Sequence, residues 1–350
     1  EKSNFDDSSK RDIYGDHILE LNKKDCDLAI KTSGDFMLYF DSPNTNEVKK
    51  LVKAREIWDQ FVEGNYKTAE PGIIFWSTMS DYSPSNYVDR PIICTNPCAE
   101  VPLEDGGACN LGSINLSRFI DDGFTPEASI NWDQLAESTE TLVRFLDNVV
   151  TWNEDLNALE KQRKAAAETR RLGLGVMGIA DMLNQLGVAY DSEQGVIIIE
   201  KVMEYITNAA YQASSFIAKE KKPSPIFNEQ TYMECPFVKE ALSEQTHTMI
   251  RKNGLRNIAI MSIAPTGSIS NIVLGYKSDS KNYIGVSGGV EPIFSTFYTR
   301  RSESFGNKFF KVFHSTIQAY IDKMGLQEEV DGANNIDDVL PDYLTRTAHK

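Results

Sequence analysis

Apolar positions that recur every three or four residues predict two long amphipathic helices in the middle of the chain. The first is expected directly after a capping Asn131, and the second covers 198–216. Their apolar positions are Trp132, Leu135, Leu142, Leu146 and Val149 in the first helix, and Ile198, Val202, Ile206, Ala209, Ala213 and Phe216 in the second. A further run with helical spacing lies between Lys49 and Phe61.

Two short apolar runs predict buried strands. Pro71–Trp76 follows the helix expected at 49–61, and Asn257–Ala264 ends directly before a turn. Residues 1–30 are polar and charged, which indicates a loop or a short strand and helix. The order of strand, loop, helix, strand and helix favours an α/β fold with a largely parallel sheet.

The size and composition of the chain allow one large domain. Its 350 residues are 41% hydrophobic, enough to bury a substantial core, so a single domain is expected over 1–350. The formal net charge of −15 argues against a nucleic-acid surface or an anionic membrane, because both need clustered Lys and Arg. No apolar run approaches a membrane span and the first residues lack a signal-peptide pattern, so a cytoplasmic protein is expected.

Five cysteines, an odd number, do not indicate a disulfide framework in a chain of this length. Three of them, Cys94, Cys98 and Cys109, lie within sixteen residues. A zinc site there is disfavoured, because zinc normally takes four ligands and no histidine lies near the cluster. Cys26 and Cys235 have no motif around them and are interpreted as packing residues.

The segment from Thr95 to Glu100 contains the most informative side chains. Asn96, Cys98 and Glu100 occupy alternating positions, so on an extended backbone all three would project to one side. They could then converge on one small ligand. The amide would be a hydrogen-bonding group, the thiol a one-electron or nucleophilic centre, and the carboxylate an acid or base.

Two glycine-containing segments are candidate phosphate sites. Gly173, Gly175 and Gly178 have the G-x-G-x-x-G spacing of a dinucleotide loop, but a charged, helical stretch precedes them where such a loop needs an apolar strand. They are interpreted as positions of close packing between a helix and a strand. Ala264–Ser270 follows an apolar strand and offers backbone N–H groups, hydroxyls and a helix start, which suit a phosphate site or an ordinary helix cap.

Five blocks of sequence, in the family's order, resemble those of the catalytic subunit of ribonucleotide reductase. The blocks are Asn96–Glu100, Gly107–Leu116, Arg170–Gly178, Ala264–Ser270 and Gly289–Phe294. The resemblance extends from about Gly34 to about Tyr343, nearly the whole chain. It implies a ten-stranded α/β barrel with a finger loop inserted through its centre. It also implies an enzyme that reduces ribonucleoside diphosphates or triphosphates to 2′-deoxyribonucleotides for DNA synthesis.

The resemblance implies a role for each residue of the central motif. Cys98 would sit at the tip of the finger loop and become the thiyl radical that abstracts the 3′-hydrogen of the substrate ribose. Glu100 would act as the base on the 3′-hydroxyl, and Asn96 would hold the ribose hydroxyls as water leaves C2′. Cys109 would be one half of the dithiol that supplies two electrons. The implied substrate-binding residues are Thr95, Asn96, Pro97, Cys98, Ala99, Glu100, and, for the phosphates, Pro265, Thr266, Gly267, Ser268 and Ile269.

The short spacing from Cys98 to Cys109, together with the amino-acid sequence of residues 107–116, most resembles the adenosylcobalamin-dependent branch of the family. This implies adenosylcobalamin as the cofactor. The alternative is a radical supplied by a separate metal-containing subunit, with no cofactor in this chain. A ribonucleotide substrate, a reductant of the thioredoxin or glutaredoxin type and an oligomeric enzyme are implied as well.

The chain also departs from the family pattern. In the family, the partner of Cys109 lies far upstream in a strand that would precede residue 1, as would the effector-binding region. The last barrel strands and the shuttle cysteines would follow residue 350, and Tyr276–Gly285 resembles an insertion. We therefore expect a central barrel segment, either a split-gene product or a fragment, that works with companion chains. The alternative is a piece inactive alone that supplies the finger loop to such an assembly.

Overall fold

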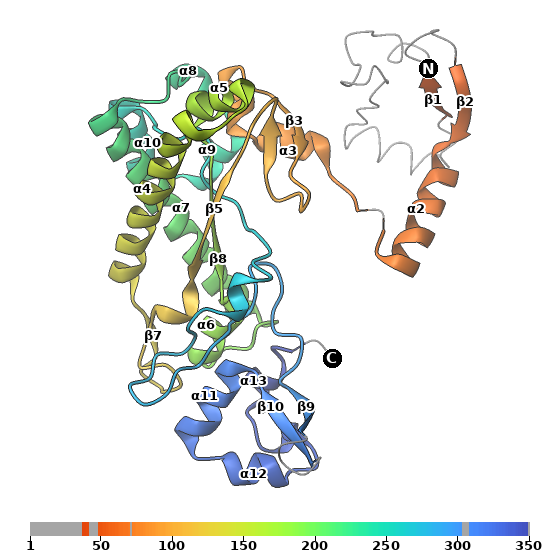
Figure 1. Cartoon of the computed structure of the whole chain (residues 1–350), viewed down its shortest axis with the longest axis vertical. Coiled ribbons are helices and arrows are strands. Elements are labelled where there is room, and N and C mark those ends of the chain that lie inside the picture. The colour runs from red at the N-terminus through yellow and green to blue at the C-terminus, as the bar shows by residue number, and fades with distance from the viewer. Residues whose placement is uncertain (1–36, 42–47, 71, 303–307, 349–350) are drawn as a thin grey trace. The chain divides into compact units, whose positions relative to one another are not determined.

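The computed structural model describes residues 37–41, 48–70, 72–302 and 308–348 (Figure 1). The chain forms two compact units, Glu1–Tyr82 and Ser83–Lys350. The expectations for residues 1–30 and for Cys26 lie outside the described residues, and the single domain expected over 1–350 stays a prediction.

The first unit begins its described part with a β-hairpin. β1 (Met37–Asp41) pairs antiparallel with β2 (Val48–Lys53), and α2 (Ala54–Thr68) follows without a break. The helix predicted for 49–61 is therefore wrong over its first residues. The reason is tertiary, because backbone pairing with β1 holds that stretch as a strand.

The buried strand predicted for Pro71–Trp76 is wrong. Pro71 lies outside the described residues, and 72–75 has no regular secondary structure. The side chain of Phe75 is 71% exposed, and Trp76 begins the short helix α3 (Trp76–Tyr82). An apolar run thus predicted burial that the fold of this unit does not provide.

Parallel strands lie at the centre of the second unit (Figure 1). β5 (Asn110–Asn115) pairs parallel with β8 (Leu172–Met177), every residue of which is buried. On the other side of β8, the Leu174 N–H donates to Ile260 O at 2.8 Å and the Ser262 N–H donates to Leu174 O at 2.9 Å. The strand predicted at 257–264 is thus confirmed as an extended segment, although only one regular bridge, Leu174 to Met261, forms there.

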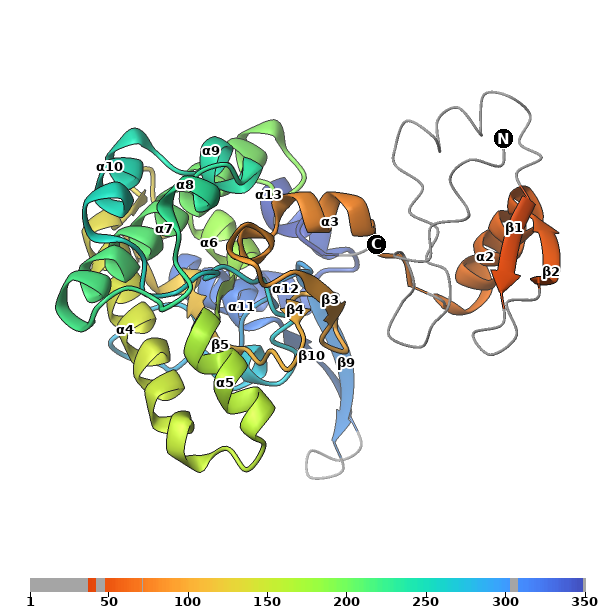
Figure 2. The ribbon, with the colours of Figure 1, turned by 90° about the horizontal axis from the view of Figure 1, so that it is seen from above.

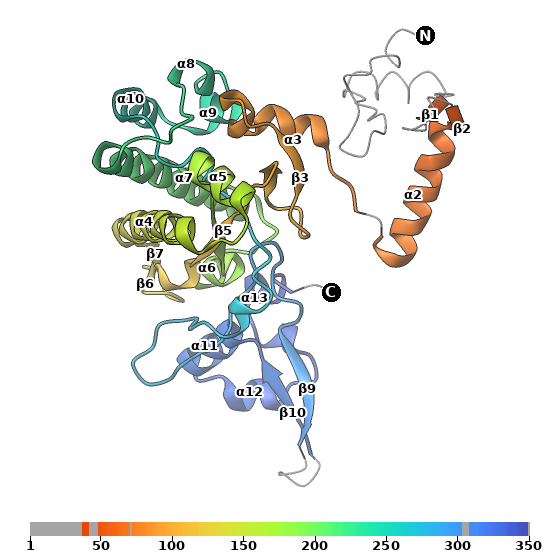
Figure 3. The same ribbon diagram turned by 45° about the horizontal axis from the view of Figure 1, so that its top comes forward.

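Two long helices pack against one another beside these strands, as the apolar periodicity predicted (Figure 3). α4 (Trp132–Leu156) begins after Asn131, whose side chain accepts a hydrogen bond from the Gln134 N–H. α7 (Glu193–Lys221) is the second helix. Of the apolar positions predicted for it, Phe216 near its C-terminal end is exposed, at 49%, and the others are buried or half-buried. Figure 2 shows α4 and α7 on the same side of the second unit as α10 (Glu244–Asn253).

The remaining elements are mostly short. They are η2 (Pro84–Val88), β3 (Ile92–Thr95), β4 (Pro102–Glu104), η3 (Leu116–Arg118), β6 (Ile120–Asp121), β7 (Ser129–Ile130), α5 (Glu160–Thr169), α6 (Ile179–Gln185), α8 (Glu229–Tyr232), α9 (Pro236–Ala241), η4 (Ile269–Asn271), β9 (Phe297–Ser302), β10 (Lys308–Phe313), α11 (Ser315–Met324), α12 (Gln327–Gly332), η6 (Ile336–Asp338) and α13 (Asp342–Thr345). Among the described strands, β5 and β8 pair parallel and the other four pairs are antiparallel. The mixed α/β content is confirmed, but the largely parallel sheet is wrong for the described chain, because local hairpins supply most of the pairing.

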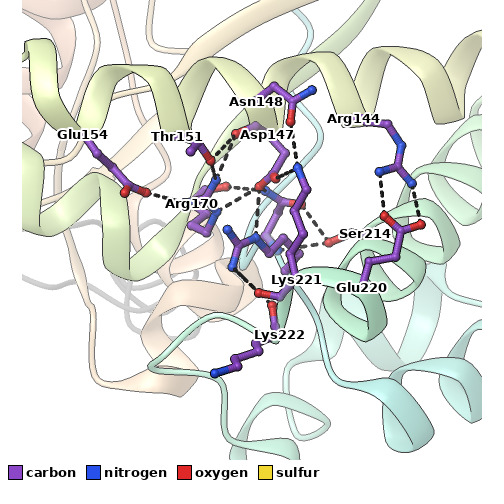
Figure 4. A network of polar contacts seen from close by, with 12 residues as sticks. Arg144, Asp147, Asn148, Thr151, Glu154, Arg170, Ser214, Glu220, Lys221 and Lys222 are labelled. Atoms are coloured by element: carbon purple, nitrogen blue, oxygen red, sulfur yellow. Dashed lines mark hydrogen bonds and ion pairs between the residues drawn. The ribbon is translucent and has the colours of Figure 1, made fainter.

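A buried ion network ties the helices to the start of β8 (Figure 4). Arg170 ends α5 in a left-handed conformation, and its Nε donates to Asp147 Oδ1 of α4 at 2.9 Å. Asn257 donates from Nδ2 both to that carboxylate, at 3.1 Å, and to Arg170 O, at 2.9 Å. Both charged side chains are almost fully buried, and each has a further ion-pair partner: Arg170 pairs with Glu154 at 2.8 Å, and Asp147 lies 3.4 Å from Arg256 and 3.7 Å from Lys221.

The stretch expected as an insertion, Tyr276–Gly285, folds back on itself. The Gly275 N–H donates to Tyr283 O, and the Gly285 N–H donates to Val273 O, both at 2.8 Å. The Tyr283 hydroxyl donates to Asp322 Oδ2 of α11 at 2.7 Å. The stretch is therefore anchored to α11. In the described part of the chain, none of the helices combines the length and the apolar character that crossing a membrane requires.

Candidate active site

The loop 96–101 joins β3 to β4 as a tight turn. The Ala99 N–H donates to Asn96 O at 3.0 Å, and the Val101 N–H donates to Asn96 Oδ1 at 3.0 Å. Pro97 takes the second position of the turn, and Ala99 has a left-handed φ of 64°. The backbone from Asn96 to Glu100 is therefore not extended, so the condition for all three side chains to project to one side is not met. A proline at this turn position and an asparagine that bonds the backbone ahead of it both favour a turn.

The turn separates the three side chains by depth. Cys98 is exposed at its tip, and its Sγ has no hydrogen-bond partner among the described residues. Glu100 is half-buried, and its Oε2 is fully buried without a partner in the same part of the chain. An unpaired buried carboxylate oxygen is costly, which marks this atom as one that awaits a donor. Thr95 and Asn96, both half-buried, continue from β3 into the loop.

The loop is fixed to the parallel strands through Glu100. The Ser262 hydroxyl donates to Glu100 O at 3.0 Å. Ser262 ends the segment that runs along β8 and leads directly into the loop beginning at Pro265. One hydrogen bond to the backbone carbonyl of Glu100 therefore connects the loop of the first predicted site to the segment that leads into the second.

Cys109 lies immediately before β5, half-buried, over the start of β8. A β-carbon added to Gly173 would lie 2.6 Å from its Sγ, and one added to Gly175 would lie 2.2 Å from Ser262 O. These glycines permit close approach, as predicted, but their partners are the neighbouring strands and a cysteine, whereas a helix was expected. Gly178, with a φ of 74°, begins α6.

The thiol of Cys109 is held in its protonated form. Burial raises the pKa of Cys109 to about 12, against a smaller lowering by the nearby positive charge of Arg171. The negative charges of Glu100 and Glu104 raise the Cys109 pKa further. At neutral pH the group is therefore a hydrogen donor rather than a thiolate, and Glu100 is its electrostatic neighbour.

The loop at Pro265–Ile269 follows the extended segment 257–264 that lies beside β8. Thr266 is buried with a left-handed φ of 56°, whereas Pro265, Gly267 and Ser268 are exposed. The N–H groups of Gly267 and Ser268 have no acceptor within the described residues. The helix start expected here is wrong, because Ile269 opens only one turn of 3₁₀-helix, η4. Free N–H groups remain, and no protein atom lies within 4 Å of a β-carbon built on Gly267.

A second segment, 287–289, supports this loop. The Gly289 N–H donates to Thr266 Oγ1 at 3.0 Å, and a β-carbon on Gly289 would lie 2.1 Å from Ala264 O. The Ser287 N–H donates at 2.7 Å to Oδ2 of Asp181, a fully buried residue of α6. The loop therefore lies past the carboxyl end of β8, the edge where parallel sheets bind ligands.

Two buried acids of this site escaped the sequence analysis. Asp181 holds the 287–289 segment, and Glu104 forms an ion pair with Arg171 beside Cys109. Asp181 follows the glycine motif and Glu104 stands within the stretch between two cysteines, but neither belongs to a pattern that marks a site. Their partners are distant in sequence, so only the folded chain identifies them.

The sequence profile of the family described as "Ribonucleotide reductase, barrel domain" matches residues 13–342. The chain therefore belongs to the ribonucleotide reductase family.

Among its relatives is the vitamin B12-dependent ribonucleoside-diphosphate reductase of Thermoplasma acidophilum, 36% identical over 274 residues, which are 78% of this chain and 31% of the relative. The protein of the same description from Mycobacterium tuberculosis is 34% identical over 259 residues, 74% of this chain and 32% of the relative. The ribonucleoside-diphosphate reductase subunit alpha of Chlamydia muridarum is 29% identical over 305 residues, covering 78% and 26% of the two chains. The chain thus spans about a third of the length of the first two relatives.

A solved structure shares the fold. The Actinobacillus ureae class Id ribonucleotide reductase alpha subunit superposes with a TM-score of 0.58 at 21% sequence identity. The match covers 85% of this chain and 49% of the solved chain. At this identity the likeness establishes the fold alone.

Proposed function

We propose that this chain carries the radical thiol of an enzyme that reduces ribonucleotides to 2′-deoxyribonucleotides. The observation that carries the proposal is the pairing of an exposed Cys98 thiol with a buried, unpartnered Glu100 oxygen two residues later. The proposal includes the ten-stranded barrel, in which β5, β8 and the segment at 258–262 would be neighbouring parallel strands and the loop 96–101 would be the finger loop.

Hydrogen abstraction is the first step of the proposed mechanism. A Cys98 sulfur radical takes the hydrogen atom from C3′ of the ribose, so an S–H bond forms and the C3′–H bond breaks. Oε2 of Glu100 accepts the proton of the 3′-hydroxyl, which satisfies its unused lone pairs. Because Oδ1 of Asn96 already accepts the Val101 N–H, its Nδ2 is the group that can donate to the ribose hydroxyls.

Reduction follows loss of the 2′-hydroxyl as water. Cys109 and a second thiol supply two electrons and two hydrogens and become a disulfide, and Cys98 returns a hydrogen atom to C3′. The high pKa of Cys109, about 12, suits this role because the proton and electron leave together from a thiol. A reductant of the thioredoxin or glutaredoxin type would then restore the dithiol of the whole, oligomeric enzyme, which we place in the cytoplasm.

The loop from Pro265 to Ile269 would bind the substrate phosphates. Its free N–H groups at Gly267 and Ser268 can donate to an anion without help from Lys or Arg. The open space above Gly267 leaves room for a phosphate. Such a loop would allow a chain with a net charge of −15 to hold an anionic substrate.

We propose adenosylcobalamin as the radical source, as in the relatives named vitamin B12-dependent. The exposed thiol of Cys98 fits a source that approaches from outside the loop. When bound, the cofactor supplies the radical that removes the hydrogen atom from this thiol. The alternative source is a separate metal-containing subunit. Within the described residues, no group of three or more His, Cys, Asp or Glu side chains could itself hold a metal ion.

Replacement of Cys98 tests the proposal. In the active enzyme that contains this chain, Cys98→Ser should abolish deoxynucleotide formation, because an O–H bond is too strong to form a radical at a useful rate. Cys94→Ser is the matched control, since Cys94 is also exposed and lies in β3 of the same hairpin. Turnover by Cys98→Ser with a strong chemical reductant would exclude Cys98 from the mechanism, and loss in both variants would indicate damage to the hairpin.

A further inference from the structure

A buried ion pair lies beside Cys109. Arg171 and Glu104 have side chains only 4% and 2% exposed. The Arg171 guanidinium donates to Glu104 Oε2 from Nη2 at 2.6 Å and from Nε at 3.1 Å. Oε1 of the same carboxylate accepts the Thr169 hydroxyl at 2.8 Å, and Arg171 Nη2 also donates to Ser85 Oγ at 3.0 Å. Both charged groups are therefore fixed in direction as well as buried.

The pair joins the two backbone stretches that surround the thiol. Glu104 begins the turn toward Cys109, because the Gly107 N–H donates to Glu104 O at 2.8 Å. A β-carbon on Gly107 would lie 3.0 Å from the Glu104 carboxyl carbon, so the chain passes closely over this group. Arg171 stands two residues before Gly173, whose α-carbon lies against the Cys109 sulfur. Displacement of either charge would thus move one wall of the thiol site.

Three charges act on the Cys109 thiol. The positive charge of Arg171 lowers the Cys109 pKa, whereas the negative charges of Glu104 and Glu100 raise it. Because the Glu104 carboxylate accepts hydrogen bonds from Arg171, its negative charge partly cancels the electrostatic potential of the arginine at the Cys109 sulfur.

We propose that Arg171 and Glu104 are positioning residues that set the acidity of Cys109, with Arg171 supplying a stabilising positive charge and Glu104 fixing and attenuating it. The proposal deepens the proposed function, because Cys109 is the redox thiol there. Its effect on the thiol does not depend on turnover. The two variants Glu104→Gln and Arg171→Gln should therefore shift the reactivity of Cys109 in opposite directions.

The test is the rate of Cys109 alkylation by iodoacetamide in the whole chain, followed by peptide-resolved mass spectrometry at several pH values. Glu104→Gln, nearly isosteric, should raise the rate at fixed pH by roughly threefold or more, because less negative charge favours the thiolate. Arg171→Gln should lower it by a similar factor. Arg171→Lys, which keeps the charge, should stay within about twofold of the wild-type rate.

Internal controls are present in the same digest. Cys94 is exposed and its rate should be unchanged, while Cys235 is fully buried and its labelling reports unfolding. Faster labelling of Cys109 in both Gln variants, or no change in either, would overturn the proposal and assign the pair to packing. If Cys235 becomes alkylated in the Arg171→Gln variant, that variant is unfolded and the other two decide. A higher rate of Cys109 alkylation in Glu104→Gln, together with a wild-type rate in Arg171→Lys, supports the proposal, and any other result overturns it. Failure of Cys98→Ser to abolish turnover would reject the proposed function without changing these rates.

Discussion

The α-carbon of Gly173 lies against the sulfur of Cys109, so close that a β-carbon on the glycine would approach Sγ to 2.6 Å. The same β-carbon would meet Leu111 Cδ2 at 2.5 Å. Both distances are well below van der Waals contact. Gly173, the first glycine of the G-x-G-x-x-G motif, thus leaves space for the Cys109 thiol at the start of the parallel strands β5 and β8.

Substitution of Gly173 by alanine should therefore displace Cys109 and destabilise the fold. Overpacking of this kind typically costs about 1–3 kcal/mol, which urea denaturation would measure. Gly332→Ala is the control, because no atom lies within 4 Å of a β-carbon at that position. Equal stability of Gly173→Ala and wild type, with unchanged alkylation of Cys109, would show that the contact relaxes without cost.

Removal of the Cys109 thiol should separate radical formation from reduction. In the active enzyme, Cys109→Ser should still form the radical at Cys98 and consume substrate, because the two sulfurs have different proposed roles. The expected products are free base and little deoxynucleotide, measured by chromatography of a single reaction mixture. Normal multiple turnover by this variant would mean that another thiol supplies the electrons.

A side chain at Gly267 should weaken substrate binding without disturbing the fold. Apart from the chain neighbours, no atom lies within 4 Å of a β-carbon there, so the side chain of Gly267→Val enters open space. If one or two charge-assisted hydrogen bonds to phosphate are lost, at about 1.5–3 kcal/mol each, the ribonucleotide Kd should rise roughly tenfold or more. Calorimetric titration of the active enzyme measures this, with Gly332→Val as the comparison. An unchanged Kd would leave the loop with a structural role only.

His314 should make stability depend on pH in the weakly acidic range. Burial lowers the pKa of His314 below its ordinary 6.5, outweighing the attraction of Asp181, whose Oδ1 lies 3.8 Å from Nδ1. The folded state therefore keeps the imidazole neutral while the unfolded chain takes up a proton. Stability contributed by the neutral form should be complete above pH 6.5 and decline as the pH falls from there toward the folded pKa.

The measurement is urea unfolding of wild type and His314→Gln between about pH 7.5 and 5, a range that spans the ordinary histidine pKa. The difference in unfolding free energy between the two proteins should change with pH across that window. Parallel profiles would show that His314 titrates alike in both states. Asp181 contacts Ser287 as well, so the histidine is replaced and the aspartate is kept.

Sequence periodicity by itself determined the long helices, because a buried stripe on a long helix repeats often enough to be read without knowledge of its partner. Asn131 caps α4 as expected, and the apolar positions predicted for the second helix are buried or half-buried in α7 except Phe216. Short apolar runs were not decisive. Leu51 lies in β2 because β1 pairs with that stretch, and Phe75 is exposed although it belongs to an apolar run. A run of six residues contains too little pattern to distinguish a strand, a helix and a loop.

The chemistry of the site was determined by local sequence, and its geometry by the tertiary structure. The residue types around Cys98, and their order along the chain, identified the family before any fold was known. Asn96 and Pro97 also favour the local turn that the structure contains. Only the folded chain decided that Glu100 keeps a buried oxygen unpaired and that Arg171 reaches Glu104. The physical reason is distance along the chain: Glu104 and Arg171 are 67 residues apart, and no local pattern records which distant charge a buried group will meet.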